Sequence, residues 1–127
     1  MTSRPLILKL TTLEPEKAAQ ALNVASVSLA SGAKVSLWLT GDAIRLAQPG
    51  FAETIQLEHS APFNELLEAI LAAGSITACT QCLARRSLSQ SDLIASVGVA
   101  GAGSFADRKS TRLNSSHMSE SRMPSSA

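Results

Sequence analysis

The residues best suited to covalent chemistry are two cysteines, Cys79 and Cys82, which are separated by two positions. A thiolate is a strong nucleophile, and its pKa falls where backbone N–H groups at a helix start and nearby cations stabilise the charge. Arg85 and Arg86 follow about one helical turn later and would add positive potential. The pattern predicts a reactive cysteine site, although Cys79, at the end of an apolar stretch, could instead be a small buried hydrophobic residue.

The same spacing also suits a thiol–disulfide site or half of a zinc site. A structural zinc ion needs four ligands, but the sequence has no second cysteine pair, and His59 is the one histidine before residue 107. We therefore expect no bound metal ion, and His59 is most simply a surface residue. A thioredoxin-like domain is also disfavoured, because it would carry its cysteine pair after an early strand.

Glycines near the expected strand ends complete the set of candidate residues. Gly41 and Asp42 follow an apolar stretch; the glycine would relax a turn, and the aspartate would cap a short helix or face the thiol. Gly101 and Gly103 lack the third spaced glycine of a dinucleotide fingerprint, so they indicate a tight turn beside the cysteines. We expect no nucleotide or other cofactor.

Alternating strand and helix patterns are expected to position these residues. Short apolar runs predict strands, and apolar side chains at helical spacing predict helices, the first of them capped by Thr11 or Thr12. The expected strands span 6–10, 34–40, 75–79 and 97–100, and the expected helices span 18–29, 43–47, 62–73 and 79–88, with a brief extended piece at 55–57. The alternation predicts an α/β fold with a parallel sheet covered on both faces.

Parallel strands bring their carboxyl ends to one edge of the sheet, and ligands and reactive groups gather outside that edge. The segments 40–42, 79–82 and 101–104 all follow predicted strands. We therefore expect the candidate residues to converge there. Trp38 alternates with leucines inside the second strand and is expected to serve in packing.

The composition excludes several classes of function. Residues 1–106 hold seven Lys and Arg against eight Asp and Glu, a net charge of −1, so no basic surface for nucleic acid or an acidic membrane is predicted. Three Phe, one Trp and no Tyr provide no aromatic platform for stacked bases. No apolar run reaches the roughly 18 residues of a membrane span and no signal peptide is evident, so we expect a cytoplasmic protein.

The sequence changes character at Asp107. The last residues, DRKSTRLNSSHMSESRMPSSA, are rich in Ser and Arg, have no apolar period, and can be back-translated into a common sequencing-adapter strand. We expect a single α/β domain over residues 1–106 and a foreign, disordered tail over 107–127. The native protein would then continue beyond residue 106, and the chain as written would be marginally stable.

The order and spacing of several segments resemble the DsrE-like (DsrE/DsrF/DsrH) family of small sulfur-handling proteins. These segments are VSLWLTGDAIRLAQPG at 35–50, ELLEAILAAG at 65–74, ACTQCLARRSL at 78–88 and DLIASVGVAGAGSF at 92–105. The resemblance implies a three-layer, flavodoxin-like fold with a mostly parallel sheet, whose last helix and strand would be missing here. It also implies assembly into homo-oligomers, as trimers or hexamers.

The resemblance further implies sulfur relay, in which a cysteine receives a sulfane sulfur as a persulfide and passes it on. The carrier would correspond to Cys79 or Cys82, and we favour Cys79 because it immediately follows a strand, with Cys82 as a resolving or second carrier thiol. The partners would be sulfur donor and acceptor proteins or small thiols. Two alternatives stay open: a thiol–disulfide redox protein, and a non-enzymatic oligomeric protein that binds a small ligand.

Overall fold

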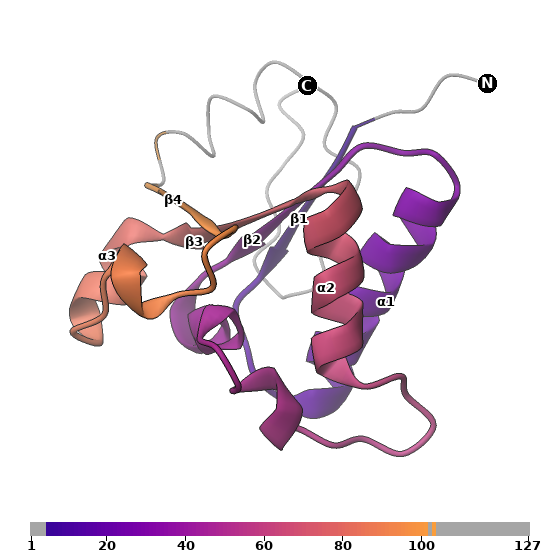
Figure 1. Cartoon of the computed structure of the whole chain (residues 1–127), viewed down its shortest axis with the longest axis horizontal. Coiled ribbons are helices and arrows are strands. Elements are labelled where there is room, and N and C mark those ends of the chain that lie inside the picture. The colour runs from indigo at the N-terminus through magenta and orange to yellow at the C-terminus, as the bar shows by residue number, and fades with distance from the viewer. Residues whose placement is uncertain (1–4, 102, 104–127) are drawn as a thin grey trace.

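The molecule is built on one four-stranded, all-parallel sheet. The computed structural model describes residues 5–101 and 103. The strands lie in the order β1 (Leu6–Leu10), β2 (Val35–Leu39), β3 (Ser75–Cys79) and β4 (Gly98–Ala100). The helices among the described residues are α1 (Pro15–Ala30), α2 (Phe63–Ala73) and α3 (Thr80–Arg85), with 3-10 turns η1 (Gly41–Ala47), η2 (Ala52–Thr54) and η3 (Gln90–Asp92) (Figure 1). The predicted α/β class is confirmed.

Alternation along the strands gives the sheet two different faces. Leu8 pairs with Leu37, and Leu37 pairs with Ile76, so these side chains share one face, where they join the main hydrophobic core. Their sequence neighbours point the other way. On that second face, Ile7 and Trp38 form a separate small buried cluster.

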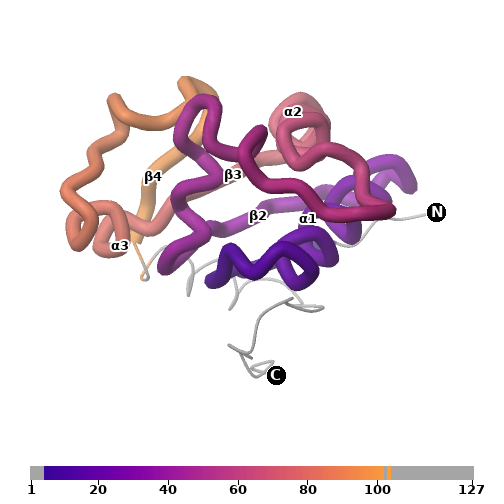
Figure 2. The backbone as a smooth tube through the Cα atoms, turned by 90° about the horizontal axis from the view of Figure 1, so that it is seen from below, coloured from indigo at the N-terminus to yellow at the C-terminus, as the bar shows by residue number. Residues whose placement is uncertain are grey.

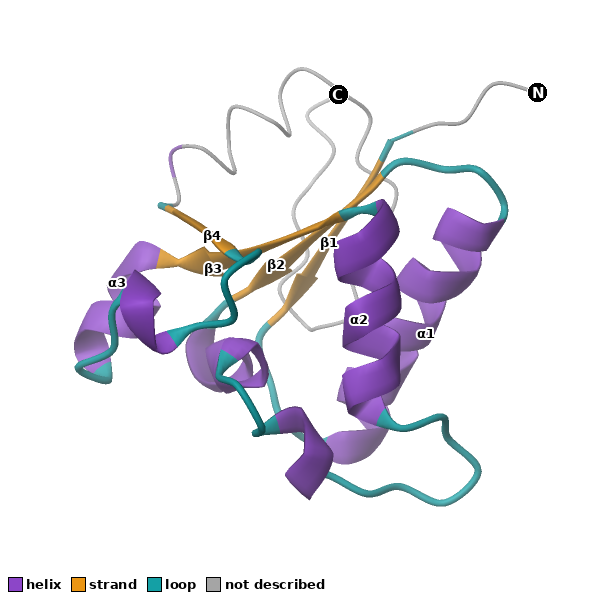
Figure 3. Ribbon diagram, in the orientation of Figure 1, coloured by secondary structure: helices purple, strands orange, loops and turns teal. Residues whose placement is uncertain are grey.

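The long helices α1 and α2 cover the first of these faces (Figure 3). Both contribute to the main core, α1 through Ala21 and Leu22 and α2 through Phe63 and Ile70, and the two helices pack against each other. Right-handed crossovers that step across a sheet in one direction place successive helices on the same face. From the sequence we expected helices on both faces; among the described residues, the long helices cover one face.

The short helix α3 lies apart from these two, at the opposite end of the molecule from α2 (Figure 2). It follows β3 directly and packs against that strand and against η1. Within the described part of the chain, no helix is both long and apolar enough to cross a membrane. The predicted boundary after residue 106 and the predicted foreign segment 107–127 lie outside the described residues.

Most predicted boundaries are close to those in the structure. The strands predicted at 6–10 and 75–79 have those bounds, and the helix predicted at 62–73 begins one residue later. The helix predicted at 79–88 ends earlier, at Arg85. Gly74 separates α2 from β3, and a Cβ atom there would lie 2.7 Å from the Val35 carbonyl oxygen, so this position has no room for a side chain.

One local prediction was wrong. The N-cap of α1 is Glu14, whose carboxylate accepts a hydrogen bond from the Lys17 N–H at 2.9 Å, while Thr12 instead accepts one from the Glu14 N–H. The short helix predicted at 43–47 is present as the 3-10 helix η1, which begins two residues earlier and ends at Ala47. At 55–57 no strand forms, although the backbone of Ile55 is extended.

The packing of α1 on the sheet predicts a large difference between two substitutions in that helix. Leu22 is fully buried, whereas Val27 is 65% exposed. Leu22→Ala should lower the free energy of unfolding by about 2–5 kcal/mol, because it leaves a cavity in the core. Val27→Ala should change it by less than about 0.5 kcal/mol. Urea denaturation followed by circular dichroism measures both, and equal stabilities would contradict this placement of α1.

Candidate active site

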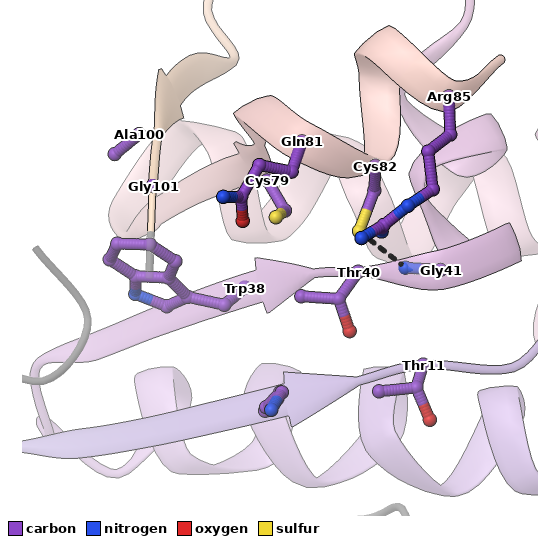
Figure 4. A pocket seen from close by; sticks show the side chains of 11 residues that line it. Thr11, Trp38, Thr40, Gly41, Cys79, Gln81, Cys82, Arg85, Ala100 and Gly101 are labelled. Atoms are coloured by element: carbon purple, nitrogen blue, oxygen red, sulfur yellow. Dashed lines mark hydrogen bonds between the residues drawn. The ribbon is translucent and has the colours of Figure 1, made fainter. Parts of the chain in front are cut away.

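A pocket opens at the carboxyl edge of the sheet, where the sequence predicted that reactive groups would converge. Its volume is about 330 Å³. It is lined by residues from the ends of all four strands and from α3: Lys9, Thr11, Trp38, Thr40, Gly41, Cys79, Gln81, Cys82, Arg85, Ala100 and Gly101. Figure 4 shows both cysteine sulfurs pointing into it, with Trp38 at one end and Arg85 at the other. Among the described residues, the lining contains two cationic side chains and no carboxylate.

Cys79 occupies the junction between β3 and α3. It is the last residue of the strand and the N-cap of the helix, and its side chain is buried. Burial raises the pKa of its thiol, but the backbone N–H groups of Cys82 and Gln81, the thiol of Cys82 and the charge of Arg85 lower it. The lowering contributions prevail, so the pKa of Cys79 lies below its ordinary value.

Cys82 lies at the third position of α3 and has a different environment. Its Sγ accepts a hydrogen bond from the Gly41 N–H at 3.1 Å. Burial raises the pKa of its thiol, and the neighbouring Cys79 raises it further, while the Gly41 N–H and Arg85 act in the opposite direction. The net pKa is above the ordinary value, so Cys82 stays protonated when Cys79 has ionised.

Gly41 is required where it stands. Its φ is +56°, a conformation that L residues with side chains seldom adopt, and a Cβ atom would lie 2.9 Å from the Thr11 carbonyl oxygen. The turn after β2 therefore runs close to the end of β1. This close approach directs the Gly41 N–H at the sulfur of Cys82.

The two arginines of α3 have separate roles. Arg85 lines the pocket and lies near both thiols. Arg86 instead forms an ion pair with Asp42 at 2.8 Å, and its Nη1 donates to the Cys82 carbonyl oxygen at 3.1 Å. We expected both arginines to add positive electrostatic potential at the thiols. Arg85 does so, whereas the charge of Arg86 is balanced by Asp42.

Asp42 neither caps η1 nor lines the pocket. The N-cap of η1 is Thr40, which makes no side-chain capping bond, and the Asp42 carboxylate accepts two hydrogen bonds from Arg86. This pair connects η1 to α3. Because Asp42 is largely exposed, the pair contributes modestly to stability and acts mainly in positioning.

Sequence reasoning missed several residues of the pocket. Lys9 and Thr11 come from the end of β1, and Gln81 lies between the cysteines. Trp38, predicted to serve in packing, is buried and also forms a wall of the pocket. The alternation of β1 was the available signal: Lys9 lies between the buried residues Leu8 and Leu10, and it therefore shares a face with Trp38.

Gly101 and His59, two further residues considered from the sequence, have clear positions in the structure. Gly101 lines the pocket, but a Cβ atom there would meet nothing within 4 Å, so lack of space does not require glycine. His59 is exposed and does not line the pocket. Within residues 5–101 and 103, no group of three His, Cys, Asp or Glu side chains could hold a metal ion.

Comparison with known proteins decides the family. A model of the DsrE/DsrF-like family matches residues 7–110, a span that includes the pocket lining and, apart from Leu6, the four described strands. The chain belongs to the DsrE/DsrF-like family. Membership is consistent with sulfur relay in general, and it confirms the resemblance on which the sequence analysis relied. A search of curated proteins gave no match.

Solved structures share the fold of this DsrE/DsrF-like protein. The ychN protein from E. coli superimposes with a TM-score of 0.72 at 18% identity, over 92% of this chain and 99% of that one. MTH1491 from Methanobacterium thermoautotrophicum, described as a protein of unknown function, gives a TM-score of 0.70 at 10% identity, over 86% of this chain and 94% of its own. At these identities the likeness shows the fold alone.

The opposite pKa shifts of the two thiols predict that alkylation will distinguish them. The thiolate is the reactive form, and it appears as the pH rises through the pKa. Because the pKa of Cys79 is lowered and that of Cys82 is raised, iodoacetamide should modify Cys79 first. The rate at Cys79 should reach half its maximum at a lower pH, and the advantage should be about tenfold for each unit that separates the two pKa values.

Peptide mass spectrometry after short labelling, from pH 6 to pH 10, measures this difference. The Cys79→Ser and Cys82→Ser variants are matched controls, since each leaves one thiol to be titrated alone. In Cys82→Ala, which removes the side-chain donor, the half-maximal pH of Cys79 should move upward, because the Cys82 thiol helps to lower its pKa. Faster labelling of Cys82 near neutral pH would reverse the assignment.

Proposed function

We propose that this protein is a sulfur carrier that holds sulfane sulfur as a persulfide on Cys79. The observation that carries the proposal is a thiol of lowered pKa that points into a pocket next to a second thiol and a cation. Sulfur transfer requires an accessible nucleophilic thiolate and no redox cofactor. Membership of the DsrE/DsrF-like family supports the same chemistry.

The transfer is a pair of displacements at sulfur. The Cys79 thiolate attacks the outer sulfur of a donor persulfide, R–S–SH; a new S–S bond forms to Cys79, and the donor leaves as R–S⁻. An acceptor thiolate then attacks the terminal sulfur of the Cys79 persulfide, and Cys79 leaves as a thiolate. Electrons balance in each step, because one S–S bond forms as another breaks.

The pocket residues suit both the attacking thiolate and the persulfide anion that follows. The N–H groups of Gln81 and Cys82 and the charge of Arg85 stabilise negative charge at Cys79. Lys9 lines the pocket as well, and within residues 5–101 no carboxylate lines it that would repel an anionic donor. Burial of Cys79 keeps bulk solvent away from the bound sulfur.

The proposal predicts that Cys79 gains one sulfur atom. After brief anaerobic exposure to a small persulfide such as cysteine persulfide, intact-mass spectrometry should show an adduct of about 32 Da, which peptide mapping should place on Cys79. The adduct should disappear when an acceptor thiol is added. Cys79→Ser should acquire none, and a chain that takes up sulfur equally well without Cys79 would refute the proposal.

Arg85 provides a second test, because its charge favours the thiolate of Cys79. Arg85→Ala should slow sulfur uptake about two- to fivefold, the scale expected for a partly exposed charge interaction. Lys17→Ala is the matched control: it removes one positive charge from an exposed position on α1 and should leave the rate unchanged. Equal rates of sulfur uptake in the wild type, Arg85→Ala and Lys17→Ala would show that Arg85 does not assist the reaction.

A further inference from the structure

We propose that Cys82 is a resolving thiol that releases the sulfur carried on Cys79 as sulfide and leaves a Cys79–Cys82 disulfide. This second activity rests on the proposed function, because it starts from the Cys79 persulfide. It would make the protein a persulfide reductase that acts once and then needs an external thiol. An acceptor thiol and Cys82 would thus compete for the same carrier.

The positions of the two cysteines permit a bond between them. Both are free thiols in this structure; Cys79 is the N-cap of α3 and Cys82 stands three residues later in its first turn. Residues three apart in a helical turn have Cα atoms about 5 Å apart, within the range of about 4.4–6.8 Å that disulfides span. Both sulfurs point into the same pocket (Figure 4).

The environment of Cys82 prepares it to act as a nucleophile in a second step. The Gly41 N–H directed at its Sγ, at 3.1 Å, would stabilise the negative charge that develops as the thiol loses its proton. Gly41 itself is held by its close approach to Thr11. The Asp42–Arg86 ion pair and the bond from Arg86 to the Cys82 carbonyl oxygen fix α3 against the same turn.

The reaction balances without an added oxidant. The Cys82 sulfur attacks the inner sulfur of the Cys79 persulfide; the Cys79–Cys82 bond forms, the bond to the outer sulfur breaks, and the outer sulfur leaves as HS⁻ with the proton of Cys82. The two cysteine sulfurs are oxidised, and the sulfane sulfur is reduced to sulfide. Because Cys82 is buried and its pKa is raised, the step would be slow enough for an acceptor thiol to intercept the persulfide.

The experiment follows one anaerobic turnover of the full chain. The protein is loaded with cysteine persulfide and desalted, and free sulfide and intact mass are then recorded over time. In the wild type, the adduct of about 32 Da should give way to a species about 2 Da lighter than the reduced protein, with about one equivalent of sulfide released. Oxygen is excluded, so the sulfane sulfur is the electron acceptor for the disulfide.

The Cys82→Ser and Cys82→Ala variants should reach the same adduct as the wild type. They should release sulfide at least about tenfold more slowly, without losing 2 Da. Equal sulfide release in wild type and both variants, or a stable wild-type adduct with no disulfide, would overturn the inference while the carrier function stands. Failure of Cys79 to load in any protein would instead refute the carrier function, and the inference with it.

Discussion

The hydrogen bond from the Gly41 N–H to the Cys82 sulfur, at 3.1 Å, connects the turn after β2 to the helix after β3. It exists because the chain at Gly41 adopts a positive φ close to the Thr11 carbonyl oxygen, where a side chain would not fit. Through this bond the ends of β1 and β2 determine the position of Cys82. The Cys82 thiol helps to lower the pKa of Cys79, so the chemistry of the thiol pair is connected to a glycine 41 residues away from Cys82 in the sequence.

The two thiols differ chemically although their side chains are buried to a similar degree, 9% and 7% exposed. Desolvation alone would raise both pKa values. The pKa of Cys79 is lowered because two backbone N–H groups and the Cys82 thiol stabilise its thiolate. The Cys82 sulfur accepts a hydrogen bond from one backbone N–H, and the charge of Cys79 raises its pKa. The number of hydrogen-bond donors, and not the depth of burial, therefore separates the pKa values of the two thiols.

The strand order determines which residues line the pocket. With the strands in sequential order, α1 and α2 share one face and bury its leucines. The alternate residues, Lys9 and Trp38 among them, fall on the opposite face beside Cys79. The fold recurs in ychN and MTH1491 at 18% and 10% identity, so it tolerates replacement of most individual side chains.

The sequence alone determined the alternating strands and helices, the family, and the place of Cys79 at a strand-to-helix junction. These features follow from local periodicity and from residues next to one another in the chain. The tertiary structure decided which side chains meet. Arg85 and Arg86 are neighbours, yet one lines the pocket and the other pairs with Asp42, 44 residues away, because successive helical residues point about 100° apart. The position of Lys9 in the pocket and the Gly41–Cys82 hydrogen bond likewise depend on segments that are distant in sequence. Packing between whole elements determines such contacts.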